Sequence, residues 1–224
     1  MTVLCLLEGV IPDEIRSDFI ACLTSYTGNE AKNFVEHRIY LKNVKDDGCT
    51  YYLSRLIHSK ILFECSEKDL EALKYQGKSN LASTWKLISL GRDTTVERDI
   101  SLFPIEQFTF RTGDPISFLE ATGFSYDYEM IRIGVEFIHP SGIRISIYSP
   151  LAVEKKKDLS SIKSIGKDEQ DGSIQSPIDM WIVETTKASI TEQSKTSSTQ
   201  LMEFATSLLS FVTLSKRQKS VHKG

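Results

Sequence analysis

The side chains that could carry out chemistry are scattered along this 224-residue chain, without the spacing that catalytic or metal sites require. No histidine belongs to an H-E-x-x-H or H-x-E motif, and no two cysteines form a C-x-x-C pair. G-x-S-x-G, P-loop and G-x-G-x-x-G motifs are absent as well. The residues concerned are His37, His58, His139 and His222, with Cys5, Cys22, Cys49 and Cys65. We therefore predict no catalytic residue, no metal site and no cofactor.

Neighbouring carboxylates give no stronger signal. Glu64 and Glu67 are three residues apart in a polar segment, and acids at such spacing usually form a solvated face. The net charge of -3 gives no reason to expect direct nucleic-acid binding by the body of the protein. Without a secretory leader or an apolar run of bilayer length, we expect reduced cysteines and a soluble protein of the cytosol or nucleus, with no membrane contact.

The elements that must position any site are mostly strands, and one hairpin can be registered from sequence alone. A three-residue loop of residues 140–142, Pro-Ser-Gly, would pair Phe137 with Ile145 and Val135 with Ile147. A two-residue or four-residue loop would instead set apolar side chains opposite polar ones. Proline and glycine also suit the two ends of such a loop, so we predict this register.

The other face of the hairpin carries Arg132, Glu136, Arg144 and Tyr148. Because side chains alternate across a strand, these four share one side of the sheet. This side is either a solvated outer wall or the lining of a polar interior.

The strand before the loop changes the parity of its large side chains. They occupy even positions from Phe124 to Met130 and odd positions from Ile131 to Phe137. A regular strand with one buried face cannot do this, so we predict a bulge near residues 129–131 or a change of buried face. Both are common where a sheet curls into a barrel. Alternatively, the first aromatics are simply amphipathic surface groups.

Patterning elsewhere predicts further strands joined mainly by hairpin connections, and three helices. The helices are expected from Pro12 to Gly28, over a turn or two after Asp114, and over residues 197–214. The further strands are expected at residues 2–8, 34–41, 51–57, 60–65, 85–90, 105–111 and 178–186. This order favours a mainly β (α+β) fold, an antiparallel and closed β-barrel with peripheral helices near the two ends of the chain.

We predict a single domain over residues 1–224, with two segments that do not join its core. Residues 154–176 have few apolar side chains and are interpreted as a mobile insertion. Residues 215–224 are basic and are interpreted as a frayed tail.

The last helix has a wider apolar stripe than one packing partner normally covers. It either lies on its own sheet or also meets another protein. The stripe contains Leu201, Phe204, Ala205, Leu208 and Val212, widened by Met202, Leu209 and Phe211. Apolar residues in excess of what one domain must bury suggest an interface, and the predicted partner-binding residues are Tyr126, Tyr128, Met202 and Phe211.

Several stretches together resemble the family of subunit 18 of the Mediator complex. They cover nearly the whole chain except residues 154–176 and the tail. They are LLEGVIPDE before a helix, EHRIYL, FRTGDPISFLEATGFSYDYEMIRIGVEF, IRISIYSP, and W-x-V-E before the last helix.

The resemblance implies a noncatalytic subunit of the Mediator head module in the nucleus, part of a coactivator between transcription factors and RNA polymerase II. It implies a β-barrel that pairs with the related barrel of subunit 20 and binds a C-terminal helix of subunit 8. Other head-module subunits would also be partners, and RNA polymerase II an indirect one.

The family's fold is also similar to that of the triphosphate tunnel enzymes, which gives an alternative, a metal-dependent phosphohydrolase. Those enzymes carry E-x-E-x-K/R on a strand, which places metal-binding carboxylates on one face. This sequence has no E-x-E and no strand with repeated alternating lysines and arginines. The enzyme alternative is therefore disfavoured.

Overall fold

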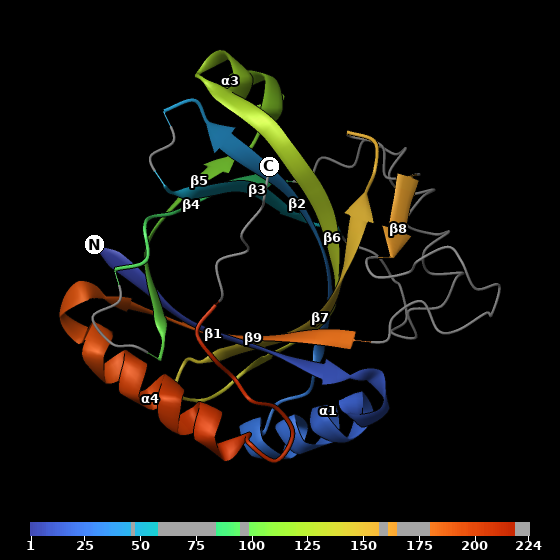
Figure 1. Cartoon of the computed structure of the whole chain (residues 1–224), viewed down its shortest axis with the longest axis vertical. Helices are drawn as coiled ribbons and strands as arrows, with labels where there is room; N and C mark the ends of the chain where they lie inside the picture. Colours follow the sequence, from blue (N-terminus) through green and yellow to red (C-terminus); the bar gives the residue numbers. More distant parts are fainter. Residues whose placement is uncertain (46–47, 58–83, 95–98, 157–160, 165–179, 218–224) are drawn as a thin grey trace.

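The computed structural model is an antiparallel β-barrel with helices packed against its outside (Figure 1). It describes residues 1–45, 48–57, 84–94, 99–156, 161–164 and 180–217. Within these ranges, eight strands close the barrel in the order β6-β2-β3-β4-β5-β1-β9-β7, and β7 pairs back onto β6. The strands are β1 Thr2–Pro12, β2 Lys32–Asn43, β3 Thr50–Leu56, β4 Trp85–Leu90, β5 Ser101–Phe110, β6 Phe124–Ile138, β7 Arg144–Val153 and β9 Met180–Ile190. The predicted closed barrel is confirmed.

The hairpin between β6 and β7 has the predicted register. Phe137 lies opposite Ile145 and Val135 opposite Ile147. The loop is closed by the backbone N–H of His139, which donates to the carbonyl of Ile143 at 2.8 Å. Its glycine has φ +82°, the left-handed conformation that a three-residue loop needs at this point.

A bulge in β6 explains the parity switch. Ile39 of β2 pairs with Glu129, but Leu41, only two residues on, pairs with Tyr126 three residues back along β6. The extra residue reverses which side chains face outward. The predicted irregularity is therefore confirmed, although it lies between Tyr126 and Glu129, slightly before residues 129–131.

The helices begin and end where the sequence predicts in two of three cases. Helix α1, Asp13–Thr27, ends at Gly28, whose left-handed conformation lets its N–H donate to the carbonyl of Thr24. Helix α3, Pro115–Ala121, starts with proline. The backbone N–H of Ile116 donates a hydrogen bond to the side chain of Asp114, the residue before the helix, at 3.0 Å.

The last helix is shorter than predicted. The 3-10 turn Thr191–Gln193 leads into α4, Ser194–Ser207, and turns follow instead of helix up to residue 211. The chain must turn there because Ser215 pairs with Glu8 of β1. No helix in the part of the chain that the structure describes is long and apolar enough to cross a membrane.

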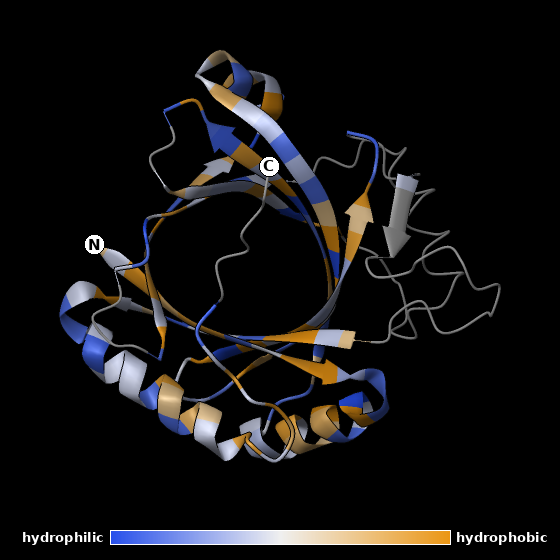
Figure 2. Ribbon diagram, viewed as in Figure 1, coloured by the Kyte–Doolittle hydropathy of each residue, from blue (hydrophilic) through white to orange (hydrophobic). Residues whose placement is uncertain are grey.

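The main apolar core lies outside the barrel, between its wall and the pair α1 and α4. Figure 2 shows apolar residues concentrated along β1 and β9 and on parts of both helices, beside polar residues on the same helices. Phe19 of α1 and Leu201 of α4 are completely buried there, as is Val183 of β9. Burying side chains of this size contributes roughly 1.5–3 kcal/mol each, which holds both helices to the sheet.

Some predicted segments differ from the structure or lie beyond what it describes. Within the predicted insertion, the short strand β8, Ile162–Ser164, pairs with β7, because β7 separates from β9 after Tyr148 and leaves an edge for it. Within the predicted tail, Ser215–Arg217 is attached to β1 and its surroundings rather than frayed. The predicted strand at 60–65, most of the predicted insertion and residues 218–224 lie outside the described residues.

Candidate functional site in the barrel interior

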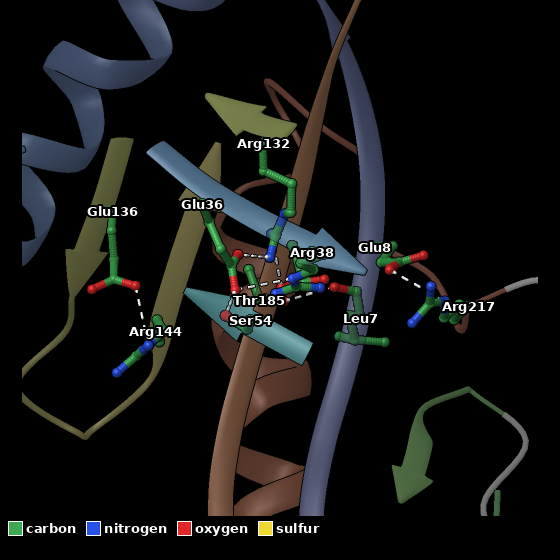
Figure 3. Close-up of polar contacts among 11 residues, drawn as sticks. Leu7, Glu8, Glu36, Arg38, Ser54, Arg132, Glu136, Arg144, Thr185 and Arg217 are labelled. Atoms are coloured by element: carbon green, nitrogen blue, oxygen red, sulfur yellow. Dashed lines mark hydrogen bonds and ion pairs between the residues drawn. The ribbon is translucent and has the colours of Figure 1, made fainter. Parts of the chain in front are cut away.

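Charged side chains from four strands meet inside the barrel. Glu36 and Arg38 are two residues apart on β2, so they share one face of the strand. Arg132 of β6 and Glu184 of β9 point toward them from other parts of the wall. Figure 3 shows Glu36, Arg38 and Arg132 converging, with Glu8 and Arg217 at one side. Of the two alternatives for the inner face of the hairpin, Arg132 supports the polar interior.

The two arginines and the two acids form a closed network around Glu36. Arg132 donates from Nη1 to Glu36 Oε2 at 2.8 Å and from Nη2 to Glu184 Oε1 at 3.2 Å. Arg38 Nε lies 3.0 Å from Glu36 Oε1. Ser54 on β3 donates its hydroxyl proton to the same oxygen at 2.5 Å. Both carboxylate oxygens of Glu36 are thus engaged by protein donors.

Tyrosine rings support the guanidinium groups. Arg132 Cζ lies 3.6 Å from the ring centroid of Tyr148, and Arg38 Cζ lies 4.6 Å from that of Tyr52. Attraction to the ring face stabilises a desolvated cation by about 2 kcal/mol. Tyr148 can lie this close because its partner across β6 is Gly134, where a Cβ would be 2.0 Å from the carbonyl oxygen of Ile147. The sequence needs glycine at that position to admit the backbone of β7.

The network keeps its acids ionised despite burial. Burial alone would raise the pKa of Glu36, but the charges of Arg38 and Arg132, with hydrogen bonds from Arg38 and Ser54, lower it to about 2. Burial would likewise raise the pKa of Glu184, yet Arg132 and Arg38 lower it. At Glu8 burial prevails over the nearby Arg217 and raises the pKa. Burial also raises the pKa of Tyr52 to about 12, so its hydroxyl stays protonated.

Another part of the interior is mainly apolar. One cluster of side chains from β1, β2, β3, β4, β5 and β6 lies there. It comprises Leu4, Tyr40, Tyr52, Ile88, Leu90, Phe103, Ile105 and Met130. This part of the interior is therefore lined by uncharged side chains rather than by cations.

This arrangement neutralises charge instead of collecting it. Glu8, Glu36 and Glu184 face three arginines, Arg38, Arg132 and Arg217, so the acids and cations of this cluster are equal in number. A triphosphate site requires a surplus of cations, and a metal site requires carboxylates with free oxygens. Among the residues the structure describes, no three His, Cys, Asp or Glu side chains could together hold a metal ion. The ion pairs of the cluster join β2 to β6 and β6 to β9.

A second polar group is buried on the outer side of the wall. Arg55 Nε donates to His37 Nδ1 at 3.2 Å, and His37 Nε2 lies 3.6 Å from Glu129 Oε1. Arg55 also stacks on Trp85, with 4.6 Å to the ring centroid. Burial lowers the pKa of His37, so the imidazole is neutral and bridges two strands.

The four predicted partner-binding residues do not form one surface. Met202 and Phe211 are half-buried against the outer core, and the Phe211 ring lies 5.4 Å from that of Phe19. Tyr126 is half-buried in a separate cluster beneath α3. Tyr128 stacks on Tyr40 at 4.4 Å and keeps 37% of its surface exposed. Contact of these four residues with a partner stays a prediction.

The interior cluster was the part of the site that sequence reasoning missed. A signal was present in the segment 34–41, where charged and apolar residues occur on both faces of the strand. Such a pattern indicates a strand buried on both sides, with Glu36 and Arg38 facing inward and His37 and Ile39 facing outward. The rule that charge marks a solvated face fails for a strand of this kind.

A family model described as Med18 protein matches residues 3–219. No curated protein sequence matches significantly. Among solved structures, a chain of the Schizosaccharomyces pombe Mediator head module has a TM-score of 0.71 at 17% identity, covering 97% of this chain and 99% of that one.

Two other solved structures are less similar. The protein PH1819 from Pyrococcus horikoshii OT3 has a TM-score of 0.51 at 9% identity, covering 91% of this chain and 89% of that one. A mimivirus capping-enzyme triphosphatase has a TM-score of 0.45 at 12% identity, with 91% and 87% covered. Identities this low indicate a shared fold only. The TM-score of the mimivirus triphosphatase is too low to support any argument.

Proposed function

The chain belongs to the Med18 family, and we propose that it serves as a noncatalytic subunit of the head module of the Mediator coactivator in the nucleus. The observation that carries this proposal is the family match over residues 3–219, together with the resemblance of the whole chain to a chain of the S. pombe Mediator head module. In this role the barrel provides a rigid body on which other subunits assemble.

The barrel interior supports a role without chemistry. Glu36 has both oxygens occupied by protein donors, and Glu184 is held by Arg132. Binding a metal would require breaking these bonds, and removing one partner of a buried ion pair costs about 3–5 kcal/mol. A polyphosphate would meet an interior whose described arginines already have acidic partners.

The partners we propose are subunit 20 as a related barrel, the C-terminal helix of subunit 8, other head-module subunits, and RNA polymerase II indirectly. Large apolar side chains on the outside support protein contacts, because exposed apolar patches mark interfaces. Phe108 and Phe118 are each 56% exposed and Leu209 is 58% exposed. Tyr126, Tyr128, Met202 and Phe211 stay candidates for such contacts.

The test is purification of the tagged full chain from nuclear extract, with identification of stoichiometric partners. We expect other head-module subunits to co-purify, and co-expression with subunit 20 to raise the melting temperature, because a ligand of the folded state stabilises it by mass action. Recovery of the chain alone, with no change in melting temperature on co-expression, would contradict the proposal.

A phosphate-release assay tests the enzymatic alternative. Nucleoside triphosphates and triphosphate-ended RNA, supplied with magnesium or manganese, should release no phosphate above background. Glu36→Gln is the matched variant, because it removes the acid at the centre of the interior cluster. Metal-dependent turnover that persists through repurification and disappears in Glu36→Gln would establish an enzyme instead.

A further inference from the structure

The end of the described chain lies across the first strand of the barrel. In Figure 1 the chain leaves α4, turns, and returns over β1 toward the barrel opening. The crossing point is Gly9, where a Cβ would lie 2.6 Å from Val212 Cγ2 and 2.7 Å from the carbonyl oxygen of Thr213. Only glycine lets the two backbones approach so closely. The glycine at position 9 is thus what makes this crossing possible.

After it has crossed Gly9, the end of the described chain pairs with an edge of β1. Among the described residues, β5 pairs with β1 only from Val3 to Leu6, which leaves the following residues without a β5 partner on that side. Ser215 takes this edge: its N–H donates to the carbonyl of Glu8 and its carbonyl accepts from the Glu8 N–H, both at 2.8 Å. This pairing is strand addition within one chain.

Side chains on both sides of Ser215 give the contact specificity. Val212 and Leu214 are buried in the outer core. Lys216 Nζ lies 3.0 Å from Asp93 Oδ2, and Arg217 Nε lies 3.6 Å from Glu8 Oε1. An apolar residue thus enters the core three positions before an arginine reaches the barrel opening.

Arg217 supplies a positive charge that balances the acids of the interior cluster. Without Arg217, the three acids Glu8, Glu36 and Glu184 would face only Arg38 and Arg132, leaving one excess negative charge. Glu8 forms its ion pair with Arg217, whereas Arg132 pairs with Glu36 and Glu184 and Arg38 pairs with Glu36. Burial alone would lower the pKa of Arg217, but Glu8, Tyr40 and Glu184 raise it, so the guanidinium lies in the field of the interior.

We propose that the β1 edge at Glu8 and Gly9 is a binding site for an extended basic peptide with an apolar residue three positions before an arginine, and that the chain fills this site in cis with residues 212–217. The edge supplies backbone hydrogen bonds, Gly9 supplies clearance, the outer core takes the apolar residue, and Glu8 takes the guanidinium. The segment is an internal ligand rather than a loose end, and a peptide of the same pattern competes with it. This inference does not depend on the proposed Mediator role.

The test uses the full-length chain and a labelled peptide of residues 211–217, amidated at its C-terminus. A double variant, Ser215→Pro with Arg217→Glu, removes the N–H that donates to Glu8 and reverses the charge that faces it. The wild type should bind the peptide weakly, because its own segment is present at an effective concentration in the millimolar range. The double variant should bind at least tenfold more tightly by fluorescence anisotropy. Lys195→Glu on the exposed face of α4 is the charge control and should behave as the wild type.

Two further arms establish what is recognised. A peptide with glutamate in place of the arginine should bind the double variant at least threefold more weakly, and adding Glu8→Gln should reduce the preference for arginine. Equal binding of the peptide by the wild type and the double variant would overturn the proposal, as would equal binding of the two peptides.

Amide hydrogen exchange in the wild type gives a second test that needs no variant. The Ser215 amide should exchange slowly, because it is bonded to Glu8. Excess arginine peptide should accelerate its exchange by displacing the segment, whereas the glutamate peptide should not. Fast exchange at Ser215 without peptide, or no response to the arginine peptide, would overturn the proposal.

Discussion

The barrel wall separates two interiors that are held together by different means. Outside the wall, beneath α1 and α4, the packed residues are almost entirely apolar. Inside the wall, an apolar half adjoins a network in which Arg132 joins Glu36 and Glu184. The outer core stabilises by removing apolar area from water, without directional constraint. The inner network contributes little net stability, but it becomes costly once a single member is missing.

This difference gives each region its own dependence on pH and on substitution. Losses in the outer core should be large and independent of pH. Losses in the inner network should depend on whether its carboxylates are ionised.

The largest effect is expected for Phe19→Ala in the outer core. The ring is completely buried and lies 5.4 Å from Phe211, so its removal leaves a cavity between α1 and the end of α4. We expect a loss of about 4 kcal/mol in the free energy of unfolding, measured by urea titration and unchanged between pH 5 and 8. Phe118→Ala is the matched control, because that ring is 56% exposed, and it should cost about 0.5–1 kcal/mol. Similar losses for both would mean that the outer core is not the main source of stability.

Arg132→Met sharpens the contrast from the inside. The substitution keeps much of the side-chain volume but leaves Glu36 and Glu184 without their shared cation. We expect a loss of about 3 kcal/mol at pH 7 that shrinks as the pH falls and the freed carboxylates take up protons. The control is Arg144→Met, whose ion pair with Glu136 is at the surface and should contribute less than about 1 kcal/mol. A loss that does not change with pH would show that Arg132 acts by packing alone.

The acid branch of the wild-type stability profile should come largely from Glu36. Its pKa is about 2 in the folded state against 4.5 for the unperturbed group, so ionised Glu36 adds stability above pH 4.5. That contribution, at most about 3 kcal/mol, is lost as the pH falls from 4.5 toward 2. Glu36→Gln should flatten this part of the profile of unfolding free energy against pH, whereas Glu136→Gln should leave it in place. An unchanged acid branch in Glu36→Gln would assign it to other groups.

Gly9 lies where the two regions meet, and its replacement should have the smallest effect of this series. In Gly9→Ala the new Cβ would clash with Val212 and Thr213, so the crossing segment must shift. We expect a loss of about 1–2 kcal/mol in unfolding free energy, together with faster amide exchange at Ser215. Val10→Ala, at a half-exposed neighbour, should change neither measurement appreciably. Unaltered exchange at Ser215 in Gly9→Ala would show that the close approach is dispensable.

The sequence predicted the local features because local rules determine them. Side-chain parity and a Pro-Ser-Gly loop leave a single register for the β6–β7 hairpin, and Asp114 with Pro115 is a local helix start. The bulge was misplaced slightly, because parity shows that an extra residue exists but allows it anywhere between Tyr126 and Glu129. Local rules of this kind reach only neighbours in sequence.

The parts that could not be predicted depend on contacts between distant residues. Met202 and Phe211 looked superfluous for one packing partner, yet both pack against the outer core, where Phe211, in the turn after α4, contacts Phe19 of α1. The direction of Glu36 and Arg38 was left open, because nothing in β2 alone reveals the Arg132 that neutralises Glu36. Which charges meet inside the barrel follows from its closure, and closure is a property of all eight strands.

The pairing of β1 with β9 also sets an order of events during synthesis. Thr2 lies opposite Ile190 and Pro12 opposite Met180, so the first strand cannot complete its place in the wall until the last has been made. At about 5–20 residues per second, the ribosome needs roughly ten to thirty seconds to make the intervening chain. For that interval the edge of β1 that β9 will cover stays open, a condition that favours aggregation of nascent chains. Shielding the first strand until the last has emerged would lower this risk.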